Sequence, residues 1–108
     1  MNLPLKKPII FFDLETTGTD IVRDKIVEIT ILRIDINQQE NLHTYLINPE
    51  RPIPPAVTKI HHITDEMVKD KPTFKELAHT IYQHFEGADI AGFNALKFDI
   101  PLLAEEFL

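Results

Sequence analysis

Hydrophobic residues in the first half of the chain fall into short runs, a pattern that predicts strands. Residues 8–12 are apolar at every position and too few for a helix, which is typical of a strand covered on both faces. The segment 25–36 is rich in β-branched residues, and the polar stretch 37–41 separates it from another strand-like segment at 42–48. This short connection predicts a hairpin between the second and third strands.

The second half of the chain carries helix signals. The prolines within 49–55 predict an extended loop, and residues 64–68 are predicted to form one short capped helical turn. Thr73 and Glu76 form a capping-box pattern, after which apolar residues recur at steps of three and four. We therefore expect an amphipathic helix that begins after Thr73 and is ended by Gly87.

The last elements complete a fold prediction. Residues 89–93 predict a fourth strand, and the helix before it allows this strand to run parallel to the first. Pro101 suits the first turn of a final helix. Its apolar residues continue up to Leu108, where the sequence ends. We expect a single α/β domain over 1–108, truncated at its C-terminus, in which an antiparallel meander plus a parallel strand form a mixed sheet with a crossover helix.

Composition mainly excludes classes of protein. Of 108 residues, 44% are hydrophobic and 26% charged, which is ordinary for a globular domain, and cysteine is absent. The lack of thiols, of a signal-peptide core and of any run near ~20 apolar residues predicts a cytoplasmic protein with no membrane partner. The 11 basic and 17 acidic residues give a net charge of −6, so nucleic-acid binding would need divalent cations to supply positive charge.

Carboxylates follow the first and fourth predicted strands. Asp13 and Glu15 are two residues apart, so strand geometry places both side chains on one face. If those strands are neighbours, Asp99 lies just beyond the same edge of the sheet, where α/β proteins bind ligands. Converging carboxylates without an adjacent basic residue favour Mg²⁺ or Mn²⁺. The pattern also fits solvated acids and a helix N-cap at Asp99, and the residues alone leave both interpretations open.

Three segments, taken in order, are similar to the motifs of a known enzyme family. Residues 12–18 read Phe-Asp-Leu-Glu-Thr-Thr-Gly, and residues 92–99 read Gly-Phe-Asn-Ala-Leu-Lys-Phe-Asp. They resemble the first and second motifs of the DnaQ-like (DEDD) 3′–5′ exonucleases. Residues 48–64 resemble the segment that connects these motifs, which commonly ends in His-Gly-Ile-Thr, so that His62 departs from it.

This resemblance implies a ribonuclease H-like fold and a reaction. Nucleoside monophosphates would be removed from the single-stranded 3′ end of DNA or RNA by hydrolysis with two Mg²⁺ or Mn²⁺ ions, which lie about 3.5–4 Å apart in such sites. By resemblance, Asp13 bridges both ions, Glu15 holds the ion that activates the water, and Asp99 supports the other. A DNA polymerase is a further partner that the resemblance implies.

The resemblance also implies contacts with the terminal nucleotide, made by Leu14, Thr16, Thr17, Gly18, His61 and Asn94. Thr16 and Thr17 fit a simple turn equally well, so the role of their side chains stays open. The histidines that carry no motif are expected at solvent-exposed positions, namely His43, His79 and His84.

The third motif of the family, a His or Tyr general base followed by a fourth Asp, is absent. No His or Tyr follows Asp99. Because a general base typically contributes about 10²–10⁴-fold, we expect a weakly active or inactive N-terminal portion of an exonuclease. Two alternatives stay open: a non-catalytic nucleic-acid- or polymerase-binding module, and a phosphatase in which Asp13 is the nucleophile.

Overall fold

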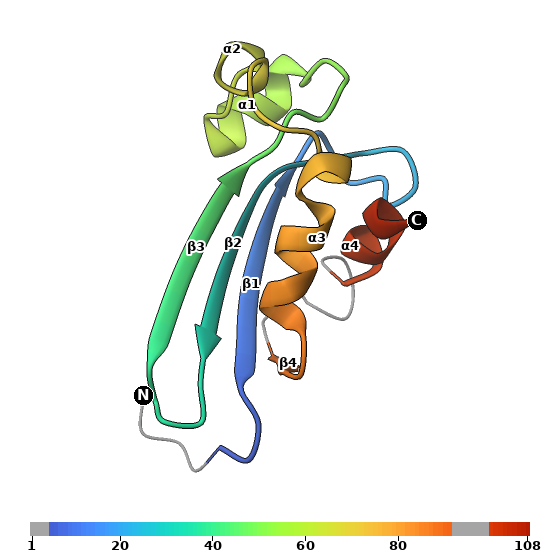
Figure 1. Ribbon diagram of the computed structural model, residues 1–108. Coiled ribbons are helices and arrows are strands. Elements are labelled where there is room, and N and C mark those ends of the chain that lie inside the picture. Colours follow the sequence, from blue (N-terminus) through green and yellow to red (C-terminus); the bar gives the residue numbers. More distant parts are fainter. Residues whose placement is uncertain (1–4, 92–99) are drawn as a thin grey trace.

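The computed structural model describes residues 5–91 and 100–108, whose strands form one mixed sheet (Figure 1). The strands β1 (Ile9–Thr16), β2 (Ile26–Ile34), β3 (Glu40–Leu46) and β4 (Asp89–Ala91) lie in the order β3-β2-β1-β4. The first three pair antiparallel as a meander, whereas β4 pairs parallel with β1. This topology confirms the predicted mixed α/β sheet and makes β1 an interior strand.

Helices cover one face and one end of this sheet. In Figure 1, α3 (Phe74–Phe85) and α4 (Ile100–Phe107) lie over one face, and α1 (Pro55–His61) and α2 (Asp65–Val68) lie beyond the ends of β1 and β3. The long helix α3 is the predicted crossover, since it precedes the parallel strand β4. Within the described ranges, no helix has the length and apolar character needed to cross a membrane.

Two predicted boundaries are wrong in ways that matter for the site. The strand predicted over 8–12 continues to Thr16, so Asp13 and Glu15 lie within β1 and not after it. The loop predicted over 49–55 gives way to α1 at Pro55, because the first helical position tolerates the missing N–H of proline. The predictions of α2, of the α3 capping box and of Gly87 after that helix are confirmed.

Alternate residues of β1 separate the core from the opposite face of the sheet. Ile10, Phe12 and Leu14 are buried in the main core, to which α3 and α4 also contribute. Ile9 and Phe11 point the other way and are only partly buried, so the expectation of a strand covered on both faces holds for one face. A smaller core attaches the α1–α2 segment to β2 and consists of Val27, Ile53, Ile63 and Val68.

The expected exposure of the histidines without motifs is wrong for His84, which is partly buried. Its Nε2 lies 2.7 Å from the Tyr45 hydroxyl oxygen, and its ring centroid lies 4.4 Å from that of His43 on β3. Burial, followed by the charges of His43 and Arg33, lowers the pKa of His84 below its ordinary value. The folded protein therefore favours the neutral form of this ring.

We predict that acid destabilises the protein partly through His84. Because the folded-state pKa is lowered, this contribution to stability is present above the ordinary pKa of 6.5 and is lost as pH falls through the lower folded value. Between about pH 7.5 and 5.5, the melting temperature of His84→Gln should fall less than that of the wild type. His79→Gln, an exposed change on the same helix, should behave as the wild type, and an equal fall in all three proteins would contradict the prediction.

Candidate active site

The face of β1 that points away from the main core carries the predicted metal-binding acids. Asp13 is exposed there, Glu15 is partly buried, and the strand register places Glu28 of β2 opposite Glu15. Burial and the charge of Asp13 raise the pKa of Glu15, His61 opposes this rise, and Glu28 adds to it. A cation bound here would relieve the repulsion among these carboxylates, so the oxygen donors fit Mg²⁺ or Mn²⁺.

Glu28 was not among the residues predicted from the sequence. The pairing of β1 with β2 is irregular between Glu15 and Thr16, where the partner changes from Glu28 to Ile26. A bulge of this kind leaves no trace in the hydrophobic pattern, so the register could not be derived. The available signal was the alternation of buried isoleucines with polar residues in β2, which places Glu28 on its polar face but does not identify its neighbour.

Asp99 and Asn94 lie outside the described residues, so their roles stay predictions. Within residues 5–91 and 100–108, no three His, Cys, Asp or Glu side chains are grouped so as to hold a metal ion. The described part therefore contains two of the three predicted ligands, Asp13 and Glu15. The condition under which Asp99 was predicted to join them is met, since β4 runs parallel beside β1.

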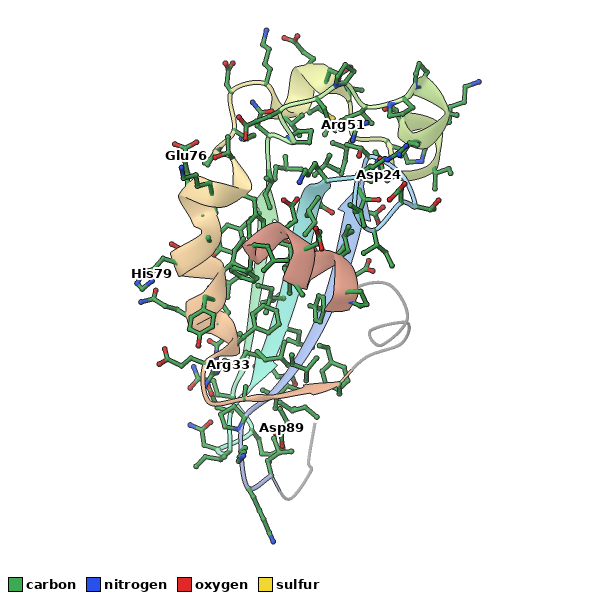
Figure 2. The ribbon with its side chains drawn as sticks, turned by 90° about the vertical axis from the view of Figure 1, so that its right-hand side faces the viewer. Asp24, Arg33, Arg51, Glu76, His79 and Asp89 are labelled. Carbon is green, nitrogen blue, oxygen red and sulfur yellow. The ribbon has the colours of Figure 1, made fainter. Side chains whose placement is uncertain are left out.

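The turn after β1 is held by its own side chains. The Thr17 hydroxyl donates to Asp24 Oδ1 at 2.8 Å and accepts from the Lys25 N–H at 3.0 Å, and Thr17 is 2% exposed. Asp24 Oδ2 accepts from the backbone N–H of Asp20 at 2.8 Å, and the Arg51 guanidinium lies 3.9 Å from Oδ1 (Figure 2). The Thr17 side chain is thus engaged within the protein, which favours the turn interpretation for this residue.

His61 connects the end of α1 to the end of β1. Its Nδ1 accepts a hydrogen bond from the Ile63 N–H at 3.1 Å, so Nε2 carries the proton in the neutral ring and donates to the Thr16 carbonyl at 3.0 Å. Both ring nitrogens are therefore used within the protein. In this arrangement His61 holds the backbone beside Glu15 and has no free nitrogen to act as a base.

A pocket of about 170 Å³ lies between the end of β1 and helix α1. Of the residues predicted to contact the nucleotide, four line it: Leu14, Thr16, Gly18 and His61. Glu15 also lines this space, which we call the Glu15 pocket, and Val57 and Ile60 of α1 add apolar surface. Sequence reasoning missed these two residues because it placed no helix at 55–61.

His62 adopts a left-handed conformation, with φ of 65°, where α1 ends. A Cβ atom disfavours this conformation, which glycine adopts freely. The DnaQ-like exonucleases, which the sequence resembles, commonly have glycine at this position. We predict that His62→Gly raises the free energy of unfolding by about 0.5–1 kcal/mol, as measured by urea denaturation. His62→Ala retains the Cβ and should give no such gain; equal stabilities of the two variants would contradict this account.

The sheet order, with an antiparallel meander and one parallel strand, places this chain in the class of ribonuclease H-like folds. Exonuclease I of Escherichia coli, solved with a dT13 oligonucleotide, superposes with a TM-score of 0.83 over 94% of this chain and 24% of its own, at 22% identity. Exonuclease I from Methylocaldum szegediense gives a TM-score of 0.78 over 88% of this chain and 22% of its own, at 25% identity. These likenesses confirm the predicted fold.

Sequence comparison then identifies the family. The chain belongs to the exonuclease family RNase_T, whose model matches residues 10–108. The DNA polymerase III epsilon subunit of Treponema pallidum is 39% identical over 95 residues, which are 88% of this chain and 44% of that protein. The epsilon subunit of Haemophilus influenzae is 39% identical over 106 residues, covering 91% of this chain and 40% of that protein. The chain thus spans less than half the length of these relatives, and its family favours the nuclease hypothesis over the phosphatase.

Proposed function

We propose that this chain provides the metal-binding part of a 3′–5′ exonuclease that releases nucleoside monophosphates from nucleic-acid 3′ ends. The observation that carries the proposal is the position of Asp13 and Glu15 on one face of an interior strand, where Glu15 also lines the Glu15 pocket. Burial, and after it the charge of Asp13, raises the pKa of Glu15, and a cation bound beside both carboxylates would stabilise their charged forms.

The chain's own residues would hold the reactants in place. Asp13, Glu15 and Asp99 would hold two Mg²⁺ or Mn²⁺ ions, which would supply activation of a water and stabilisation of the leaving 3′ oxygen. The two hydrogen bonds of the His61 ring fix the end of β1, so that the backbone beside Glu15 keeps its place. The apolar surface of Ile60, which is 78% exposed, offers a base a surface to lie against.

The proposed substrate is a single-stranded 3′ end, of DNA in the first instance. At about 170 Å³ the Glu15 pocket is smaller than the ~300–1,000 Å³ of ordinary ligand pockets, so it would take part of one terminal nucleotide and exclude a duplex. The relatives are named as DNA polymerase subunits, and exonuclease I was solved with DNA oligonucleotides. These names support DNA as the substrate and a DNA polymerase as partner.

The function is tested with a 5′-labelled single-stranded oligonucleotide, excess protein and Mn²⁺. We expect slow shortening from the 3′ end with release of mononucleotides, and chelation of the metal should stop it. Shortening from the 5′ end, internal cleavage or cleavage without metal would contradict the proposal. Oligonucleotide binding that is indifferent to Mn²⁺ and to Asp13→Asn, with no cleavage, would instead identify a non-catalytic module.

A further inference from the structure

A carboxylate near the end of the chain contacts the strand that follows the acidic motif. Glu106 lies on α4, and its Oε2 accepts a hydrogen bond from the backbone N–H of Ile26 at 2.8 Å. Its Oε1 lies 3.8 Å from Lys25 Nζ, and the Glu106 side chain is 9% exposed. Removing this acceptor would leave the N–H of a fully buried residue without a charged partner.

The contacted segment is also bonded to the turn that follows Glu15. The Thr17 N–H donates to the Lys25 carbonyl at 2.9 Å, and the Lys25 N–H donates back to the Thr17 hydroxyl at 3.0 Å. Ile26 is the β2 residue that pairs with Thr16, on the far side of the irregularity in β1. Residues 25–26 are therefore held by Thr17 on one side and by Glu106 on the other.

We propose that Glu106 is a positioning residue for the metal site. It sets α4 against the start of β2, which pairs with the irregular end of β1, and through residues 25–26 it holds Glu15 and the turn behind it in place. Asp99 is joined in the chain to Ile100, the first residue of α4, so the Glu106 contact links the helix after the second motif to β2, the strand that pairs with the end of β1. This inference rests on the proposed function, since it names the residue that aligns the two parts of that site.

The test compares four variants of the whole chain by Mn²⁺ affinity and by hydrogen exchange of the Ile26 amide. Glu106→Leu removes the acceptor, Glu106→Asp withdraws the carboxylate by one methylene, and Glu106→Gln keeps an acceptor oxygen. We expect the Leu and Asp variants to weaken Mn²⁺ binding about 10–100-fold, as is typical for residues that orient metal ligands. Glu106→Gln should stay within about twofold, as should the control Glu105→Leu on the same helix.

Hydrogen exchange at Ile26 should accelerate in the Leu and Asp variants and stay slow in the Gln variant. If Glu106→Leu fails to fold, the milder Asp variant carries the comparison. Unchanged Mn²⁺ affinity in a folded Leu or Asp variant would overturn the positioning role, even if its melting temperature falls. A wild-type chain that binds no Mn²⁺ would overturn the proposed function itself, and exchange at Ile26 would still show whether the Glu106 contact exists.

Discussion

Asp13→Asn is expected to abolish Mn²⁺ binding at the end of β1 and to lower any nuclease activity by at least about 10²–10³-fold. The change removes one negative charge and keeps the shape of the side chain. Charge stabilisation by a bound metal is worth several kcal/mol, and each ~1.4 kcal/mol is a factor of ten in rate. Because Asp13 is exposed and lies beside Glu15, its neutralisation should leave the melting temperature unchanged or slightly raised.

The matched control is Asp70→Asn, which neutralises an exposed acid outside β1 and outside the Glu15 pocket. It should leave Mn²⁺ affinity and activity unchanged, which would separate a local effect from one of net charge. An Asp13→Asn protein that binds Mn²⁺ and cuts as the wild type does would show that the metal site lies elsewhere.

Gly18→Ala should have the second large effect, on both stability and metal affinity. A Cβ at Gly18 would lie 2.5 Å from Asp24 Oδ2, and that carboxylate cannot easily move because it holds Thr17 and the Asp20 N–H. Overpacking of this kind typically costs about 1–3 kcal/mol, and its relief would shift the turn behind Glu15. We expect a lower urea midpoint together with weaker Mn²⁺ binding.

Two further variants show whether the contact with Asp24 causes the effect of Gly18→Ala. Gly87→Ala is a matched change at φ of 71° with no atom within 4 Å of its Cβ, so it should cost stability without changing Mn²⁺ affinity. In an Asp24→Ala background the clash at Gly18 is absent, and the added cost of Gly18→Ala should shrink accordingly. An undiminished cost in that background would show that the Asp24 contact is not the cause.

Local sequence patterns predicted the elements of this fold well. The capping box at Thr73 and Glu76 is a contact between residues three apart, so the sequence contains all of it. The same holds for the side-chain alternation that places Asp13 and Glu15 on one face of β1. The helix before β4 allowed the parallel pairing that the structure shows, because parallel strands need a long crossover.

Contacts between distant residues could not be predicted in the same way. Glu28 faces Glu15 through the antiparallel register of β1 with β2, and Glu106 contacts Ile26 from 80 positions away. Helix α1 was missed because the prolines within 49–55 were interpreted as helix breakers, although Pro55 suits a first helical position. The motifs therefore predicted which acids share a face of β1, and the metal site there stays a prediction, while Glu28, Val57, Ile60 and Glu106 came from the structure.

The most direct test of a metal site at Asp13 and Glu15 is paramagnetic broadening of assigned backbone amide signals during titration with Mn²⁺. We expect residues 13–18 to lose intensity first, and Asp13→Asn to remove this response while Asp70→Asn retains it. Broadening centred elsewhere, for example at His43 and His84, or no broadening at the end of β1, would contradict the assignment of the metal site.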